Sequence, residues 1–444
     1  MSSGNAWSLS TQSDRFKIKY GKLADKVFNA GNPITMQVSV KNDFVGKSMI
    51  EDNPLGFSGS VGSRVMPKSN VGNYANSTLT SKKLYATVIV DRESMKASST
   101  TEGAFFKFMD KPVKDAMESF DRNKSRQFFG DGSAVLGRGK GAGPADITGN
   151  GSVGTPYIVT FAAETFFESN FEEKDFVQMV SGITDLGANA KYLKNAGGVA
   201  EGVDTETNLL EVVEVNAATY AVKLVGTSAV LAALVASTDP LPANAAIVMQ
   251  RSYMGDFSGL RLASQQSAQF DAAVAVEALY GIPVQRRWRM YYKNVGGPLT
   301  TAKINEAAIA IEKRCGKAIT MIGASYEQFT KLLDLSETQK RYTTVSPANP
   351  AYKKAQFGFE AVEYMTTTGP VPVIADRMIH PKELWLLNKN YIEFRLRPDG
   401  AKWADEDGTV FLRTGNDSYE ATYACYGELF VSPGYQGHMD NLDL

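Results

Sequence analysis

The sequence predicts an α+β protein in which one β-rich domain is inserted into a larger body. Three observations support this fold class. One long segment has apolar residues at the three- and four-residue steps of a helix, whereas many other apolar segments are short and alternate as strands do. The charge of the chain changes sharply over residues 141–250. The length of 444 residues corresponds to two to four domains.

The chain begins with a polar segment and continues with two strand patterns. Residues 1–33 carry one weakly amphipathic stretch, and we expect them to form an arm outside the core. Strand patterns at 34–41 and 82–98 flank a stretch, 51–80, that is rich in Gly, Ser and Asn. Two strands around a polar tip predict a long hairpin that projects from the body and needs a partner surface. In the second strand pattern, alternate residues are apolar and are expected to share one face (Leu84, Ala86, Val88 and Val90).

Residues 103–129 predict a long helix. Pro112 is expected to kink this helix or to begin a second segment after Asp110. The Gly-Asp-Gly run at 130–132 is expected to end it, with glycine in the left-handed capping position. The apolar residues of the segment recur at helical spacing (Phe105, Met109, Val113, Ala116, Met117, Phe120 and Phe128).

The segment 141–250 is strongly acidic. It contains thirteen Asp and Glu residues against four Lys and no Arg, a net charge of −9, which leaves +8 on the rest of the chain. A shift of this size marks a domain boundary. Short strand patterns separated by turn residues predict a β-rich unit over 145–250, entered through the glycines of 137–143.

The remaining chain alternates between helical and strand patterns. We predict an irregular, arginine-bearing segment at 251–300, a helix at 301–316, and a strand followed by a helix at 318–336. Two strands about a turn are expected at 361–376, and a strand-rich tail follows.

The glycine run behind the long helix does not have the pattern of a phosphate-binding loop. Lys140 is followed by Gly141, where a P-loop requires Ser or Thr, and Ala142 and Pro144 stand where a dinucleotide fingerprint requires glycine. The run also follows a helix, whereas phosphate loops follow a strand. We interpret it as a linker.

Histidine and cysteine are too scarce for common catalytic or zinc sites. Cys315 and Cys425 predict no disulfide framework and favour an intracellular folding compartment, and with His380 and His438 they do not make a usual Cys/His zinc site. A Cys315–His380 nucleophilic pair is conceivable, but a thiol at a helix end is more simply a packed residue. The acidic loop 405–408 lacks the further ligands of a calcium loop. We therefore predict no catalytic residue, no metal, no cofactor and no enzyme.

No segment of the sequence predicts a signal peptide or a membrane span. The most apolar window, 219–237, contains Lys223 and is interrupted at Gly226, so we interpret it as a buried strand and helix. The near-neutral total charge also gives no basic field that would indicate nucleic-acid binding by the whole chain.

The stretch 283–293 interleaves basic and aromatic residues and has two interpretations. Such a stretch stacks on nucleic-acid bases in some proteins, and it forms subunit contacts in others. We prefer the subunit contact. The resulting candidates for assembly are the basic residues of the hairpin tip and of this stretch (Arg64, Lys68, Arg286, Arg287, Trp288 and Arg289).

In their order along the chain, these segments resemble the major capsid proteins of tailed bacteriophages with the Hong Kong 97-like fold. Residues 101–137 resemble the long spine helix and the break that follows it, and residues 59–69 with 82–98 resemble the two limbs of the extended E-loop. Residues 357–388 resemble the axial (A) domain, and residues 391–437 resemble the closing strands of the peripheral (P) domain.

The resemblance implies a domain order and a function. The implied function is a structural one: self-assembly into pentamers and hexamers that form the icosahedral head shell around phage double-stranded DNA, in a virion assembled in the host cytoplasm. The implied partners are other copies of the chain, portal and scaffolding proteins, a decoration protein in some systems, and packaged DNA contacted non-specifically, with no membrane. The implied domains are an N-terminal arm (1–33), the E-loop with a flanking P-domain strand (34–100), the spine helix (101–144), the inserted β-rich domain (145–250), a P-domain segment (251–300), the A domain (301–387) and the closing P-domain strands (388–444).

Two features depart from the minimal family pattern. The β-rich segment 145–250 is additional, and the chain starts without the long charged helix of a fused scaffold, so a separate scaffold and a mature form both remain open. Two functions from other classes are alternatives to a capsid protein. A nucleic-acid-binding protein would use 283–293, and a β-sandwich enzyme is opposed by the missing catalytic motifs and by the two histidines.

Overall fold

The computed structural model describes most of the chain in separate stretches. They are residues 16, 19, 32–56, 73–93, 102–138, 147–161, 166–181, 191–192, 209–226, 246–250, 252, 254–271, 278–338, 362–366, 369–405, 410–413 and 417–444. Helices and sheets both occur, which confirms the α+β class. Several predicted features lie outside the described residues: Arg64, Lys68, the glycines of 139–143 and most of the acidic loop at 405–408.

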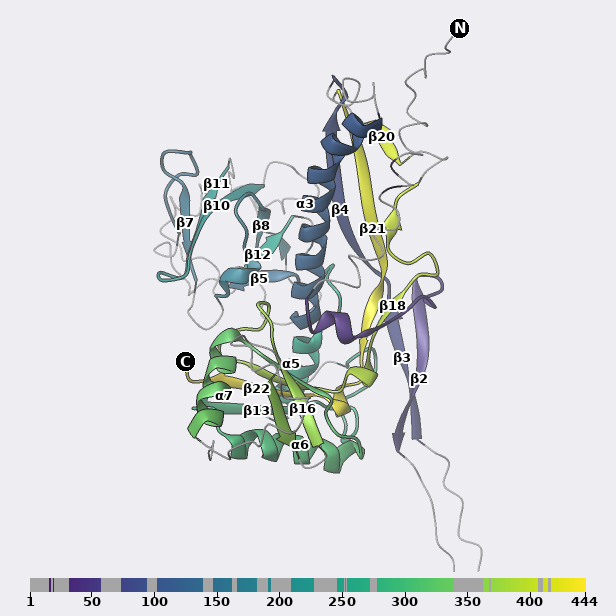
Figure 1. Ribbon diagram of the computed structural model, residues 1–444, viewed down its shortest axis with the longest axis vertical. Coiled ribbons are helices and arrows are strands. Elements are labelled where there is room, and N and C mark those ends of the chain that lie inside the picture. The colour runs from purple at the N-terminus through teal and green to yellow at the C-terminus, as the bar shows by residue number, and fades with distance from the viewer. Residues whose placement is uncertain are drawn as a thin grey trace, which may run out of the picture. The chain divides into compact units, whose positions relative to one another are not determined.

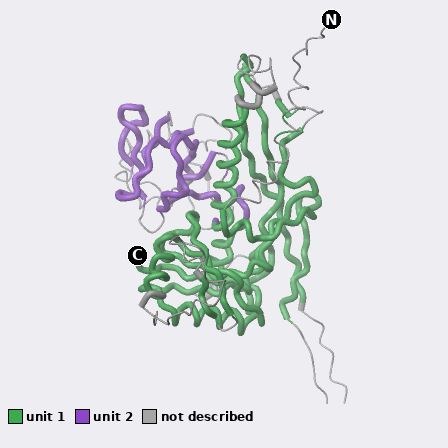
Figure 2. Tube along the Cα trace, viewed as in Figure 1, with its two compact units in different colours: residues 1–129, 258–444 green, residues 130–257 purple. Residues whose placement is uncertain are grey.

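The chain divides into two compact units (Figure 2). Unit 1 combines residues 1–129 with 258–444, and unit 2 is the continuous run 130–257. The β-rich segment expected at 145–250 lies inside unit 2, whose limits are wider at both ends because β5 (Val135–Arg138) and β12 (Ala246–Met249) pair with each other.

The long helix of unit 1 is α3 (Glu102–Phe129), which lies beside β4 (Lys82–Asp91) and β21 (Ser418–Val431) (Figure 1). It continues through Pro112, so the expectation of a second segment after Asp110 is wrong. Apolar packing explains the continuity, because the residues that follow Pro112 are buried along one face (Val113, Met117 and Phe120). The left-handed glycine after the helix is Gly132, with φ of +80°.

Strand β21 is the centre of the first sheet of unit 1. Its C-terminal half pairs with β18 (Ile392–Leu396), which also pairs with β1 (Ser39–Lys41). Its N-terminal half pairs with β4, β19 (Lys402–Trp403) and β20 (Phe411–Arg413). The alternate residues of β4 predicted to share a face are buried, as expected from the period of two (Leu84, Ala86, Val88 and Val90).

The hairpin exists, but the two predicted limbs are wrong. It is formed by β2 (Ser48–Gly56) and β3 (Asn73–Thr80). These two strands run away from β4 and β21 (Figure 1). The segment 34–41 contributes β1 instead, and β4 joins the distant strand β21. Tertiary pairing thus decides between neighbouring strand patterns that local alternation cannot tell apart.

The second sheet of unit 1 has six strands and packs against helices α6 and α7. The predicted helices at 301–316 and within 318–336 are confirmed, whereas the segment 251–300 contains the unpredicted helix α5. Helix α6 begins at the side-chain cap of Thr300, which accepts a hydrogen bond from Lys303 N, and ends at Gly316 with φ of +70°. The sheet order is β13 (Tyr291–Gly297), β22 (Gly437–Leu442), β17 (Leu384–Leu387), β14 (Met321–Ala324), β16 (Gly369–Ala375) and β15 (Val362–Thr366), and the helices are α5 (Leu260–Asp271), α6 (Thr301–Cys315) and α7 (Tyr326–Thr338).

Unit 2 is built around one sheet with an aromatic core. Phe161, Phe166 and Phe171 pack together with ring centroids 5.5 to 6.0 Å apart. Apolar residues from most of its strands complete this core. The sheet order is β5, β12, β8 (Phe176–Ser181), β10 (Leu210–Asn216), β11 (Ala221–Val225), β7 (Tyr157–Thr160) and β6 (Ile147–Thr148), and β9 (Lys191–Tyr192) pairs with β8.

Two residues of the predicted arm are described, and both attach to unit 1. Phe16 is fully buried, with its ring edge-on to Trp403 at 4.7 Å and to Phe411 at 5.2 Å between centroids. Lys19 forms a 2.8 Å ion pair with Asp110 on α3. The expectation of an arm outside the core is therefore wrong at Phe16. Among the described helices, none is long and apolar enough to cross a membrane.

Candidate assembly interface

The hairpin is fixed at its base by the side chain of Arg395, which is buried on β18. Its guanidinium donates to both carboxylate oxygens of Glu51 on β2, at 2.7 and 2.8 Å. It also pairs with Asp43 and, at 2.8 Å, with Glu393. The planar guanidinium thus binds at two points, with Nη2 on Glu51 and Glu393 and Nη1 on Asp43, and this fixes direction as well as distance. Strand β2 therefore has a defined direction relative to β18 at the base of the hairpin.

Five charged residues make up this group, which we call the root cluster (Lys41, Asp43, Glu51, Glu393 and Arg395). Lys41 pairs with Glu393 at 2.7 Å. Burial raises the pKa of Glu51, and the neighbouring Arg395 opposes that rise. Removing Arg395 would leave three carboxylates close together without their main counter-charge, so the cluster depends on it.

Polar contacts between the strands and the body hold the hairpin base further. Asn53 Nδ2 donates to Ser77 Oγ at 2.9 Å, and Ser77 Oγ donates to Glu51 O at 3.1 Å. Thr78 N donates to Tyr280 O at 2.8 Å, and the Tyr280 hydroxyl donates to Leu429 O on β21 at 2.7 Å. Both strands of the hairpin are thus anchored to unit 1.

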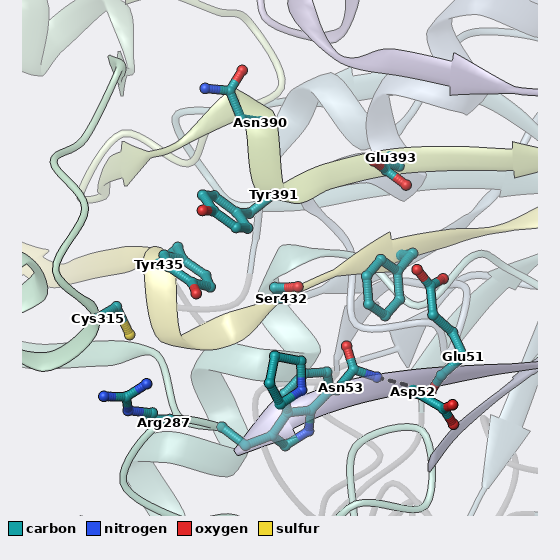
Figure 3. A pocket seen from close by; sticks show the side chains of 13 residues that line it. Glu51, Asp52, Asn53, Arg287, Cys315, Asn390, Tyr391, Glu393, Ser432 and Tyr435 are labelled. Carbon is teal, nitrogen blue, oxygen red and sulfur yellow. Dashed lines mark hydrogen bonds between the residues drawn. The ribbon is translucent and has the colours of Figure 1, made fainter. Parts of the chain in front are cut away.

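A cavity of about 280 Å³ lies beside the hairpin base, and we call it the root pocket (Figure 3). Its residues come from β2, from the loop before β13, from the end of α6 and from the β18–β21 region. They are Glu51, Asp52, Asn53, Pro54, Arg287, Trp288, Cys315, Asn390, Tyr391, Glu393, Phe430, Ser432 and Tyr435.

One wall of the root pocket is aromatic and uncharged. The rings of Tyr391 and Tyr435 stack with centroids 3.6 Å apart and an angle of 7° between planes. Burial, with the neighbouring Tyr391, raises the pKa of Tyr435 to about 12. Burial also raises the pKa of Cys315, whose Sγ donates to Gly434 O at 3.1 Å. Both groups therefore stay neutral at physiological pH.

The charges of the root pocket lie at opposite ends. Glu51 and Asp52 stand at one end, and Arg287 lies beside Cys315 at the other (Figure 3). Asp52 is exposed, and among the described residues it makes no ion pair. The pocket can therefore receive a positively charged group at the Asp52 end, against aromatic side chains.

The structure separates the four candidates of 283–293. Arg286 is exposed, Arg287 is half-buried in the root pocket, and Arg289 is half-buried with its carbonyl accepting from Arg314. Trp288 is buried: its Nε1 donates to Leu279 O at 3.4 Å and its ring packs on Phe430. Base stacking by Trp288 is therefore excluded without unfolding the loop. Arg64 and Lys68 lie outside the described residues.

Sequence reasoning missed most of the root cluster and the root pocket. No local signal marked Arg395, since it shares the polar face of an alternating strand pattern with Glu393, opposite Ile392, Phe394 and Leu396. Its partners Asp43 and Glu51 lie about 350 residues earlier and had no local signal. Tyr391 and Tyr435 likewise meet only in the folded chain.

A second polar cluster lies between α5 and the second sheet of unit 1. His438 Nδ1 is 2.5 Å from Ser264 Oγ, its Nε2 is 3.5 Å from Glu383, and Arg261 pairs with Glu383 at 2.8 Å. Although burial alone would raise the pKa of Glu383, Arg261 and His438 hold it at about 2.

Ser264, His438 and Glu383 follow one another as the serine, histidine and carboxylate of a catalytic triad do. The cluster also contains the residue types of a metal site. Ser264, His438 and Glu383 are all buried, however, so no substrate can reach the serine hydroxyl. Glu383, His438 and Asp440 bring possible ligand atoms within 4.8 Å of one another, but Arg261 already neutralises Glu383. We interpret the cluster as a buried charge network that joins α5 to β17 and β22.

The proposed Cys315–His380 pair is also not assembled. Cys315 lies in the root pocket against Gly434, whereas His380 Nδ1 accepts from Lys382 N at 3.4 Å in the loop before β17.

Comparison with known proteins adds a family match. Residues 205–417, slightly less than half of the chain, match the family model described as SU10 major capsid protein. This match confirms the resemblance to a tailed-phage major capsid protein that the sequence predicts. No curated protein sequence matches the chain.

Solved structures that the chain matches at low identity include capsids of phages and of a GTA particle. The cyanophage A-1(L) capsid asymmetric unit is 12% identical, with 94% of this chain and 93% of that chain covered and a TM-score of 0.49. Mycobacterium phage Adephagia gives 9% identity, coverage of 93% and 91%, and a TM-score of 0.38. A capsid of a native GTA particle gives 9% identity, coverage of 92% and 90%, and a TM-score of 0.36.

Proposed function

We propose that the chain is the structural subunit of a tailed-phage head, with a Hong Kong 97-like fold, and that it assembles into pentamers, hexamers and a closed icosahedral shell around double-stranded DNA. The observation that carries this proposal is the projecting hairpin, fixed at its base by the root cluster, in a chain that matches a capsid family. A hairpin with little core of its own gains stability only when its faces meet another surface. A neighbouring subunit supplies that surface.

The proposed domain roles follow from the units. Helix α3 acts as the spine, and the sheet of β1, β18, β21 and β4 forms the P domain. The six-stranded sheet with α6 and α7 forms the A domain, and β2 with β3 forms the E-loop. Unit 2 is the inserted domain, with limits of 130–257 rather than 145–250.

The charges of the two units favour an orientation of the shell. Unit 2 has fifteen acidic and seven basic residues, a net charge of −8, which leaves +7 on unit 1. A positive wall attracts packaged DNA without sequence preference, and an acidic domain is best placed on the outer face. We propose portal and scaffolding proteins as further partners during assembly in the host cell, and a decoration protein on the outer face.

Deletion of the hairpin tip tests the role of the hairpin. In the variant, residues 57–72 are replaced by a short Gly-Ser turn, and the protein is produced together with scaffold and portal proteins. We expect a folded subunit by circular dichroism and loss of shells by sedimentation and negative-stain imaging. The charge variant Arg64→Glu with Lys68→Glu should act in the same direction.

Val153→Ser is the matched control, because Val153 is exposed in unit 2 and far from the hairpin in sequence. Its shell yield should equal that of the unmodified protein. A normal shell yield from the shortened hairpin would refute the proposed role, and an unmodified protein that gives only monomers would refute the proposed function.

A further inference from the structure

We propose that the root pocket of one subunit receives the basic tip of the hairpin, residues 57–72, from a second copy of this chain. This inference rests on the proposed function and deepens it, because it names the surface that the hairpin meets. Four observations support it: the charge of the tip, the chemistry of the pocket, its size, and the attachment of the N-terminal arm elsewhere.

The tip is positively charged, opposite in sign to the Asp52 end of the root pocket. Residues 57–72 include Arg64 and Lys68 and no acidic residue, so the segment carries two positive charges. At the hairpin end of the pocket, Glu51 and Glu393 are held by Arg395, whereas Asp52 is exposed and has no ion-pair partner among the described residues. Asp52 is thus the carboxylate available to an incoming cation.

The aromatic wall suits the same kind of side chain. The stacked rings of Tyr391 and Tyr435, together with Phe430, give apolar surface for the methylene groups of lysine or arginine and π-faces for the charged end. Because the phenol of Tyr435 keeps its proton, this wall adds no charge of its own. A cation therefore finds a carboxylate and aromatic rings in one cavity.

The volume also fits a side chain better than a free ligand. The root pocket measures about 280 Å³, just below the range of roughly 300–1,000 Å³ typical of small-molecule sites. One long side chain and its backbone occupy a space of this size.

Two other segments of the chain are also basic, the arm and residues 339–359, which include Lys340, Arg341, Lys353 and Lys354. The described residues of the arm are bound elsewhere in unit 1. Phe16 is buried against Trp403 and Phe411, and Lys19 pairs with Asp110. The tip of the same subunit is disfavoured as well. Strand β2 passes the pocket at residues 51–54 and continues away from it to Gly56, so the sixteen-residue segment would have to turn back along its own strands.

Cysteine cross-linking gives a direct test, because the pocket contains a native thiol. Cys315 lines the pocket, whereas Cys425 is fully buried on β21. Ser63→Cys and Ser69→Cys each place one thiol in the tip. In assembled shells, the oxidant diamide should convert the tip thiol and Cys315 into a disulfide, accepting two electrons and two protons, and non-reducing gels should show dimers and larger ladders.

The controls assign the cross-link. Adding Cys315→Ser should abolish the ladder, and Val153→Cys in unit 2 should give no cross-link that depends on Cys315. Shells of the tip variants that show no cross-link, or an intramolecular one that leaves the subunit monomeric on the gel, would overturn the proposal. In both outcomes the shells exist, so the proposed function stands while this inference fails.

Charge exchange provides the second arm of the test. Asp52→Lys should lower shell yield at least tenfold, and Asp52→Lys combined with Lys68→Glu or Arg64→Glu should recover a large part of that loss. Asp52 is exposed, so these variants keep the fold, as circular dichroism would verify. Equal losses in the single and combined variants would show that Asp52 and the tip do not meet.

Discussion

The two units of the chain differ in how they use their residues. Unit 1 joins two distant segments and contains the longest described elements, the 28-residue helix α3 and the 14-residue strand β21, together with a hairpin that leaves the sheets. Unit 2 is one continuous segment whose described strands have at most seven residues and surround an aromatic core. The first unit has a hairpin that leaves its sheets, and the second is closed on itself.

This difference shows where the fold depends on single residues. In unit 1 a few side chains, above all Arg395 and Phe16, connect segments that are more than 300 residues apart in the chain. In unit 2 the connections stay within one continuous segment and are repeated across many strands. A substitution in unit 1 should therefore change assembly, and a comparable substitution in unit 2 should change only the stability of that unit.

The largest expected effect is that of Arg395→Met. The variant removes the guanidinium that binds Glu51, Asp43 and Glu393. Because Asp43 and Glu51 are partly exposed, the cost lies below the roughly 3–5 kcal/mol lost when one partner of a fully buried ion pair is removed. We expect a lower melting temperature for unit 1 by calorimetry and no shells. Arg395→Lys keeps the charge but not the two-point geometry. Its melting temperature and shell yield should lie between those of Arg395→Met and the unmodified protein. An unchanged shell yield for Arg395→Met would contradict a role of the root cluster in assembly.

Phe171→Ala should destabilise unit 2 by about 3 kcal/mol, because it opens a cavity beside Phe161 and Phe166. The calorimetric transition of unit 2 should move to lower temperature while that of unit 1 stays in place. Shells should still form at low temperature. A coupled shift of both transitions would show that the two units unfold together, and would contradict an independent stability of unit 2.

Phe16→Ala should release the arm from unit 1 at a cost of about 2 kcal/mol, less than for a central core position because the arm can detach locally. Limited trypsin digestion should then cut after Lys17 and Lys22, sites that all the variants keep, faster than in the unmodified protein. Lys19→Ala is the matched control: its ion pair with Asp110 is partly exposed, so the expected change is at most about 1 kcal/mol. Equal protease protection in Phe16→Ala would contradict the anchoring role.

The smallest effect concerns Asp376, at the end of β16. Burial raises its pKa to about 6, against the hydrogen bond from Met378 N, so the folded state favours the protonated form. The stability this protonation adds is complete below pH 3.8 and is lost as the pH rises to about 6. Asp376→Asn should therefore raise the free energy of unfolding by about 1 kcal/mol at pH 7 and flatten its change between about pH 4 and 6. Denaturant titrations across this range give the measurement, and an unchanged slope would refute the assignment.

Local patterns predicted the elements that local physics determines. The helix at 103–129 and the buried face of β4 follow from apolar spacing, because the apolar side chains described on each face are buried. The charge shift located unit 2 to within 15 residues at each end. The limbs of the hairpin were misassigned because β4 is paired by β21, more than 320 residues away, and alternation alone does not name a partner strand.

The site was less predictable than the fold. Arg287 was identified and does line the root pocket, but Trp288 was taken for a contact residue and is part of the core. The root cluster and the stacked pair Tyr391–Tyr435 come from segments brought together only by the sheet of β1, β18 and β21. Residues whose partners lie at the other end of the chain give no periodic signal.

Image reconstruction of particles made together with scaffold and portal proteins tests the central claim most directly. The account predicts a closed icosahedral shell of pentamers and hexamers, with unit 1 in the wall, each hairpin lying on a neighbouring subunit, and unit 2 on the outer face. Particles in which the hairpins touch no neighbour, or in which unit 2 faces the DNA, would contradict it.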